Sequence, residues 1–225
     1  MTTSIPMTHD DLTYFLQAHG RFREDTGEFR RVLHSPDQIS EERAIALVAY
    51  WDNVMELLEH HHTVEDDVIW PTLRTKTSAA DASLTLLESQ HDGLDSRAAQ
   101  VRSALVMLAG APGPADRERA AHAAEEFHRE IGTHLDQEES SVIPVMLASF
   151  SKADWLAIEG SNMESIVEHG LLARMLPWVL DGMADTPVRA ILDGMPAALV
   201  SEYRTSWYPT HQTMRRAALG PAEAS

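Results

Sequence analysis

The sequence contains no cysteine among its 225 residues. A chain without thiols forms no disulfide framework, zinc finger, thiolate nucleophile or iron–sulfur cluster, so any metal ion must be bound by nitrogen and oxygen atoms. The sequence also lacks a basic and apolar signal segment at its start, and no apolar run approaches the roughly 18 residues that a membrane span needs. We therefore expect a cytoplasmic protein.

Positive charge is also scarce. Lys and Arg number 18 against 35 Asp and Glu, which gives a formal net charge of −17. Because a surface this acidic repels phosphate backbones and anionic lipids, nucleic acids and membranes are not expected as partners. Aromatic residues make up only 6% of the chain, but apolar residues make up 44%, which is ordinary for a globular protein and excludes disorder over the whole chain.

Strand-like alternation of apolar and polar residues is absent, and residues that favour helices dominate. Thr8 with Asp11, and Ser40, carry the N-terminal capping signals of two helices. Four long helices joined by short loops are typical of an all-α, up-down-up-down four-helix bundle, which we predict for residues 1–150. The predicted helices cover about residues 9–33, 40–74, 78–110 and 115–148.

Residues 151–225 differ from the predicted bundle. Their helical stretches are shorter and are separated by glycine and proline, and they contain five of the ten methionines. Because methionine side chains adapt to irregular surfaces, we expect a C-terminal helical extension that packs against the bundle or against a partner. A homodimer contact through this extension is one such arrangement.

One short motif occurs twice. The sequence HHTVED begins at His61 and the sequence HLDQEE begins at His134, and in both a glutamate follows the histidine by four residues and a proline follows that glutamate by six. A further histidine precedes each copy, His19 before the first and His91 before the second, at separations that agree to within one residue. The matching separations indicate an internal duplication of a helical hairpin.

The spacing within the motif is chemically informative. Residues four apart lie on one face of a helix, about 6 Å apart along its axis, so each motif presents an imidazole and a carboxylate together. Buried without metal, two carboxylates and several imidazoles would cost several kcal/mol each. We therefore predict a metal site in the bundle core. The predicted ligands are His19, His61, Glu65, His91, His134 and Glu138.

This set of ligands suits two metal ions. Imidazole and carboxylate together favour iron, manganese or zinc. We expect each carboxylate to bridge both ions at a separation of about 3.5–4 Å, with His19 and His61 on one ion and His91 and His134 on the other. Open coordination positions would remain for a small ligand such as dioxygen, peroxide or nitric oxide.

In these residues the chain resembles the hemerythrin-like family of HHE cation-binding proteins. The family pattern is a histidine on the first helix, H-x-x-x-E on the second, a histidine on the third and H-x-x-x-E on the fourth, and it covers about residues 8–148 here. The resemblance implies a non-heme di-iron cofactor, two iron ions bridged by oxide or hydroxide, with Glu65 and Glu138 as bridging carboxylates. The H-x-x-x-E order argues against the ferritin-like di-iron fold, which uses E-x-x-H.

One position departs from the oxygen carriers of that family. They have a further histidine one turn after the ligand on the third helix, where this chain has Asp95. We expect Asp95 to lie on the same inward face as His91, as an additional ligand, as a partner that orients a ligand histidine, or as a solvated charge. The loss of a histidine disfavours simple reversible oxygen carriage.

Neighbours of the motif residues are further candidates. His60 and His62 point about 100° to either side of His61, so each is a candidate for an alternative ligand or an orienting group. Asp66 and Glu139 directly follow the two glutamates of the motif, and they either orient a ligand or face solvent.

Glycines and prolines lie close to the predicted ligands. Gly20, Gly93 and Gly132 stand within predicted helices, where each costs about 1 kcal/mol relative to alanine, and we attribute them to a close approach of helices around the ions. Pro71 and Pro144 each remove a helix hydrogen bond and predict kinks just beyond the site. The histidines for which we expect no metal role are His9, His34, His122, His128, His169 and His211.

Three functions are compatible with such a site. A redox enzyme would use the metal pair to react with peroxide, nitric oxide or a related small oxidant. A binding module would sense or buffer oxygen, nitric oxide or iron without turnover, with the C-terminal extension as the responsive element. A helical bundle with purely structural metal ions is the third.

Overall fold

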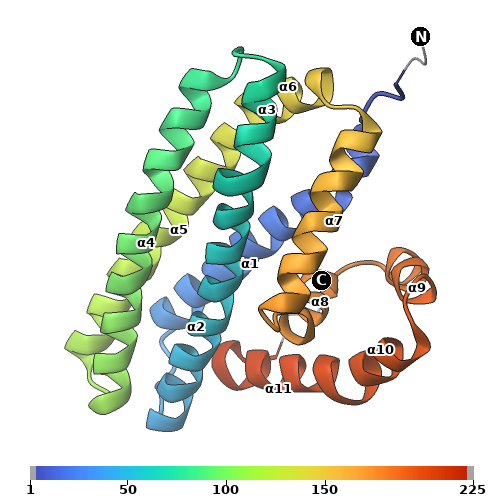
Figure 1. Ribbon diagram of the computed structural model, residues 1–225. Helices are drawn as coiled ribbons and strands as arrows, with labels where there is room; N and C mark the ends of the chain where they lie inside the picture. Colours follow the sequence, from blue (N-terminus) through green and yellow to red (C-terminus); the bar gives the residue numbers. More distant parts are fainter. Residues whose placement is uncertain (1–3, 222–225) are drawn as a thin grey trace.

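The computed structural model describes residues 4–221, and the regular structure of this part is helical, with one isolated extended bridge between Pro6 and Ser151 (Figure 1). The all-α prediction is confirmed. The N-terminal elements are η1 (His9–Leu12), α1 (Thr13–His34), α2 (Glu41–Val64), η2 (Glu65–Ile69), α3 (Trp70–Lys76), α4 (Asp81–Gly110), α5 (Pro114–Ser141) and α6 (Ile143–Ser149). The C-terminal elements are α7 (Lys152–Glu168), α8 (Leu172–Leu180), α9 (Asp185–Asp193), α10 (Ala197–Glu202), η3 (Tyr203–Trp207) and α11 (Tyr208–Leu219). Within residues 4–221 no helix is long and apolar enough to cross a membrane.

The four longest helices, α1, α2, α4 and α5, surround one large hydrophobic core. Helix α4 packs along α2 and α5, and α5 packs along α1, whereas α1 and α2 touch each other little. Phe29, Trp51, Leu105 and Phe127, one from each of these helices, are fully buried in this core. Burial of a large apolar side chain stabilises the fold by about 1.5–3 kcal/mol, so the core holds the four helices at a fixed spacing.

Two helix starts follow the capping signals read from the sequence. Thr8 and Asp11 form a capping box, with the Thr8 backbone N–H donating to the Asp11 carboxylate at 2.9 Å. This box begins the 3-10 turn η1, which runs directly into α1. At the start of α2 the Ser40 hydroxyl accepts from the backbone N–H of Arg43 at 3.2 Å. Both signals are confirmed.

The helices that carry the repeated motif are interrupted near their prolines. Pro144 follows a break at Val142, between α5 and α6. The other interruption is a π-helical turn, η2, which starts at Glu65 and ends just before α3, where Pro71 stands in the first turn. We expected this kink beyond the site, and that expectation is wrong, because the irregular turn begins at the predicted ligand itself. A π turn is wider than an α turn and changes the direction in which its side chains point.

The C-terminal segments cover the side of the bundle where α1 and α2 are not in close contact. Trp178 of α8 and Leu219 of α11 belong to the same hydrophobic core as the four long helices. Trp155 and Ile158 of α7 pack into a second cluster near η1, α3 and α6. Figure 1 shows α7 beside the bundle and α11 crossing at its lower end. The extension therefore supplies part of the wall around the bundle interior.

Candidate metal centre

Two groups of histidine and glutamate side chains lie inside the bundle, and within each group the potential ligand atoms are all within 4.8 Å of one another. The Glu138 group consists of His19, His61, Glu65 and Glu138, and the His62 group consists of His62, Glu65, His91 and His134. Helices α1, α2, α4 and α5 all contribute, and Glu65 of η2 belongs to both groups. The structure thus brings together the six residues predicted from the repeated motif and adds His62.

Glu65 faces both groups with different oxygen atoms. Its Oε1 lies 2.9 Å from His61 Nε2, in the Glu138 group. Its Oε2 lies 3.4 Å from His91 Nε2, in the His62 group. On the other side of the Glu138 group, His19 Nε2 lies 3.1 Å from His61 Nε2 and 3.6 Å from Glu138 Oε2. Because the two oxygens of Glu65 face different groups, this one carboxylate can hold two cations at once.

The potential ligand atoms of the site are buried, and many of them have no hydrogen-bond partner within residues 4–221. His19, Glu65 and Glu138 are 0% exposed, and His61, the most open, has a side chain that is 10% exposed. Within the described chain, eight donor atoms have no hydrogen-bond partner. They are Nε2 of His91 and of His134, both ring nitrogens of His62, and all four carboxylate oxygens of Glu65 and Glu138. An unpaired buried polar group costs about 1–3 kcal/mol, so these nitrogen and oxygen donors fit bound cations.

Three of the histidines are oriented by hydrogen bonds through their other ring nitrogen. The Nδ1 atoms of His19, His91 and His134 donate to Glu139, Asp66 and Gln90 at 2.9, 2.9 and 3.0 Å. Because these acceptors hold the Nδ1 side, each ring directs Nε2 into the site, and an acceptor in this position also makes the imidazole a better ligand.

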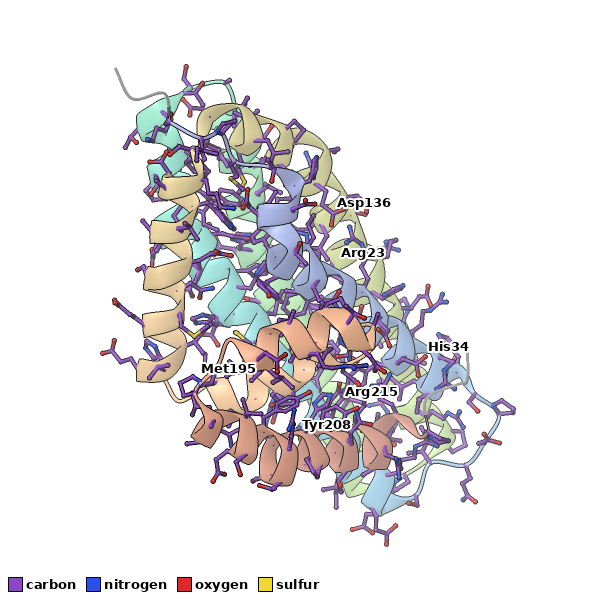
Figure 2. The ribbon with its side chains drawn as sticks, turned by 90° about the vertical axis from the view of Figure 1, so that its right-hand side faces the viewer. Arg23, His34, Asp136, Met195, Tyr208 and Arg215 are labelled. Atoms are coloured by element: carbon purple, nitrogen blue, oxygen red, sulfur yellow. The ribbon has the colours of Figure 1, made fainter. Side chains whose placement is uncertain are left out.

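Asp66 and Glu139 therefore act in the same way in the two copies of the motif. Each directly follows a glutamate of the site and accepts a hydrogen bond from a histidine on a different helix. Arg23 donates to Glu139 and to Asp136, both at 2.7 Å, and Figure 2 shows Arg23 beside Asp136 on the surface. The sequence did not indicate Gln90, although it stands directly before His91.

The surroundings of the two glutamates shift their pKa values in opposite directions. Burial opposes the ionisation of Glu65, but the imidazole of His61 and its neighbours outweigh burial and hold the pKa of Glu65 well below its usual range. Burial and the negative charge of Glu65 raise the pKa of Glu138 well above its usual range. Burial lowers the pKa of His134 to about 3. A cation binds the ionised form of a carboxylate and the neutral form of an imidazole, so cation binding at this site is linked to the release of protons.

Asp95 does not belong to the site. Its side chain is exposed on α4, so the expectation that it lies on the inward face with His91 is wrong. The buried stripe of α4 continues from His91 to Leu94, three residues later, and a side chain one residue beyond Leu94 points about 100° further round the helix. Asp95 is the solvated charge among the three roles considered for it.

The expectation about the glycines is also wrong. A Cβ atom placed at Gly20, Gly93 or Gly132 would meet no atom of another segment within 4 Å among the described residues, so no helix approaches closely there. Gly20 and Gly93 are exposed. The three positions have room for a side chain.

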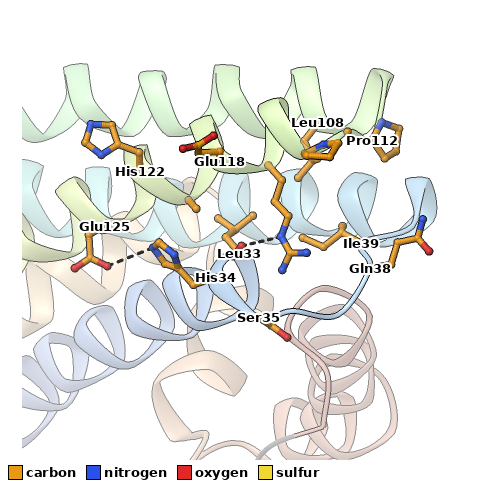
Figure 3. Close-up of a pocket in the computed structure, with 14 residues that line it drawn as sticks. Leu33, His34, Ser35, Gln38, Ile39, Leu108, Pro112, Glu118, His122 and Glu125 are labelled. Atoms are coloured by element: carbon orange, nitrogen blue, oxygen red, sulfur yellow. Dashed lines mark hydrogen bonds and ion pairs between the residues drawn. The ribbon is translucent and has the colours of Figure 1, made fainter.

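The remaining histidines lie away from the two groups. His60 Nε2 donates to the side-chain carbonyl oxygen of Asn162 of α7 at 2.8 Å. His34 and His122 line a pocket of about 690 Å³ between α1 and α5, which Figure 3 shows with His34 turned towards Glu125, 3.6 Å away. None of the residues of the two groups lines this pocket. His9, His128, His169 and His211 are likewise in neither group.

Residues 10–146 match a family model described as the Hemerythrin HHE cation binding domain. The matched stretch runs from η1 into α6 and contains every residue of the two groups. Neither the curated proteins nor the solved structures contain a match to this chain.

Proposed function

The chain belongs to the hemerythrin HHE cation-binding family, and from this premise we propose that it is a non-heme di-iron protein that binds or reacts with a small oxidant such as hydrogen peroxide, nitric oxide or dioxygen. The observation that carries the proposal is the position of Glu65, with one oxygen towards each of two groups of buried imidazole and carboxylate side chains. Two cations held by one shared carboxylate lie close enough to act as a pair.

The residues that would hold the ions are the six predicted ligands, with Glu65 shared between them. Two iron ions bound there would supply one-electron redox changes and open coordination positions for a small ligand. Glu65 and Glu138 would balance part of the positive charge. The Nδ1 hydrogen bonds to Glu139, Asp66 and Gln90 keep the histidine rings in place when a ligand enters or leaves.

Aromatic side chains lie around His61, the most exposed histidine of the two groups. The ring centroid of Phe15 lies 4.6 Å from that of His19 and 5.1 Å from that of His61. The ring centroid of Phe22 lies 5.5 Å from that of His61. Behind them, Trp155 and Trp178 of the extension contact Phe15 and Phe22. The partly exposed edge of His61 therefore stands in an apolar surround, which would suit a small, weakly polar molecule better than a large charged one.

The architecture belongs to the same proposal. An up-down-up-down order of α1, α2, α4 and α5 is supported by the short connections between them and by the contacts of α4 with α2 and α5. We propose residues 1–150 as the metal-binding unit and residues 151–225 as its extension. A cytoplasmic location and a homodimer contact through the extension stay predictions.

Metal analysis with an optical spectrum of the purified protein tests the proposal. We expect two iron ions per chain and near-ultraviolet absorption, which a zinc pair does not give. Peroxide decomposition and nitric oxide consumption by the iron-loaded protein should then exceed those of the same concentration of free iron. Zinc at full occupancy without iron preference would favour a structural metal site, and two irons with stable binding but no turnover would favour a sensing or buffering module.

A further inference from the structure

His62 differs from the other histidines of the site. It is 4% exposed, and neither of its ring nitrogens has a hydrogen-bond partner in the described part of the chain. His19, His91 and His134 each have an acceptor on Nδ1. A buried imidazole without any partner is unfavourable by about 1–3 kcal/mol, so a histidine that served only to fill space here would be a poor choice.

The position of His62 matches that of a ligand. Its ring stacks on the ring of His91, with centroids 4.0 Å apart and planes 9° apart, and it meets the ring of His134 edge-on at 5.3 Å. One ligand atom of His62 lies within 4.8 Å of those offered by Glu65, His91 and His134.

The placement follows from helix geometry. His61 and His62 precede Glu65 by four and by three residues, and side chains at both spacings are neighbours on a helix surface. Successive residues also point about 100° apart, so the two histidines lie on opposite sides of the line through Glu65. His61 falls in the Glu138 group and His62 in the His62 group. One helix thus supplies a histidine to each half of the site.

We propose that His62 is a metal ligand and that the two ions are held by unlike donor sets. This inference rests on the proposed function. The Glu138 group offers two imidazoles and two carboxylates, and the His62 group offers three imidazoles and the shared carboxylate. More negative charge in the Glu138 group favours the harder, more highly charged ion, and three imidazoles favour a divalent ion such as Fe²⁺, Co²⁺ or Zn²⁺.

Titration with Co²⁺ tests the assignment, because its visible spectrum reports the donors around each ion. We expect two ions per wild-type chain in two distinguishable steps. His62→Ala should weaken one step by at least about 100-fold and leave the other unchanged. His62→Phe keeps a flat ring that can stack on His91 but offers no nitrogen. This variant should therefore bind Co²⁺ in the affected step as weakly as His62→Ala. His60→Ala, from the same run of histidines, should bind both ions like the wild type.

The absence of cysteine provides a direct readout of ligation. A His62→Cys variant would contain the chain's one thiol, so a thiolate-to-cobalt charge-transfer band would locate the metal at position 62. His60→Cys should show no such band. Circular dichroism and a thermal melt confirm that each variant is folded.

The outcomes separate this inference from the proposed function. Wild-type protein that fails to bind two ions overturns both. Tight binding of two ions by both the wild type and His62→Phe would overturn the assignment of His62 but not the proposed function. A His62→Cys protein that binds two cobalt ions without the charge-transfer band would do the same.

Discussion

In each copy of the motif, two consecutive acidic residues have different roles. Glu65 and Glu138 point into the two groups, and the residues after them, Asp66 and Glu139, each hold a histidine of another helix by its Nδ1 atom. The duplication preserves this arrangement, but the two glutamates are not equivalent. Glu65 belongs to both groups and Glu138 to one. We expected each glutamate to bridge both ions. The position of Glu65 fits this expectation, whereas Glu138 lies in one group only.

Replacement of the two glutamates should therefore have unequal effects. Glu65→Ala is expected to lose both ions, because each group loses a donor and the pair loses its shared anion. Glu138→Ala is expected to retain one ion, held by the complete His62 group. Iron per chain after gel filtration measures the difference. Equal iron content in the two variants would show that both carboxylates have the same role.

The exposed helical glycines offer a stability test that leaves the site untouched. Gly20→Ala and Gly93→Ala should each raise the free energy of unfolding by about 0.5–1 kcal/mol, because alanine loses less backbone entropy and the space is open. For a chain of this size the melting temperature should rise by roughly 2–4 °C per kcal/mol. Gly170→Ala is the matched control, since its surroundings are equally open but its φ of +68° disfavours a side chain. A fall in melting temperature for Gly20→Ala would indicate a packing role that the structure does not show.

At this scale the sequence predicted most of the site. The repeated spacing of histidine and glutamate predicted six of the seven residues of the two groups, because residues four positions apart lie on the same face of a helix. The spacing alone could not show whether the residue three or four positions after a ligand histidine faces inward. Asp95 lies four residues after His91 on a helix whose buried stripe takes the position three residues on, and only the packing of α4 shows which one turns inward.

On the scale of elements, the π turn η2 is the least regular part of the site. The backbone N–H of Trp70 bonds the carbonyl of Glu65, five residues back, in place of the usual four. Pro71 has no N–H to offer the preceding turn, so a regular helix through this point would lose a hydrogen bond. The wide turn directs Glu65 between the two groups, whereas Glu138 stands in regular α5.

Pro71→Ala should therefore weaken metal binding without unfolding the chain. The restored N–H allows α2 to continue as a regular helix, which turns Glu65 away from one group. We expect cobalt affinity to fall by at least about 10-fold, while the metal-free protein melts at the same or a higher temperature. Pro144→Ala is the control, because its break follows a glutamate that already lies in regular helix. Unchanged affinity in Pro71→Ala would mean that the π turn has no part in placing Glu65.

The helices themselves were largely predictable, because capping residues, loop residues and apolar periodicity agreed over long segments. The π turn was not, since five residues leave no periodicity to distinguish a wide turn from a proline kink. The methionine content predicted an extension that packs against the bundle or against a partner. Nothing in the local sequence showed that Trp178 enters the core of the bundle.

For the molecule as a whole, a buried charge joins the extension to the bundle. Asp25 of α1 is fully buried and accepts hydrogen bonds from Trp178 Nε1 at 2.7 Å, Tyr50 Oη at 3.0 Å and an Arg21 guanidinium nitrogen at 3.1 Å. Arg215 of α11, labelled in Figure 2, lies 3.9 Å from the same carboxylate. The donors come from α1, α2 and the extension, so the carboxylate can be satisfied only when these segments are docked together.

This network leads to a prediction about cooperativity. Asp25→Ala leaves the buried guanidinium of Arg21 without its inner partner, and loss of one member of a buried pair costs about 3–5 kcal/mol. We expect the variant to lose that much unfolding free energy and to unfold in a single step. Tryptophan fluorescence, to which Trp155, Trp178 and Trp207 of the extension and Trp51 and Trp70 of the bundle contribute, should change in one step. The step should fall at the same denaturant concentration as the loss of the metal absorption, which reports the bundle. Asp95→Ala, an exposed acid on α4, should stay within about 0.5 kcal/mol of the wild type. If residues 151–225 were an independent domain, part of the fluorescence change would separate from the loss of the metal absorption in the wild type.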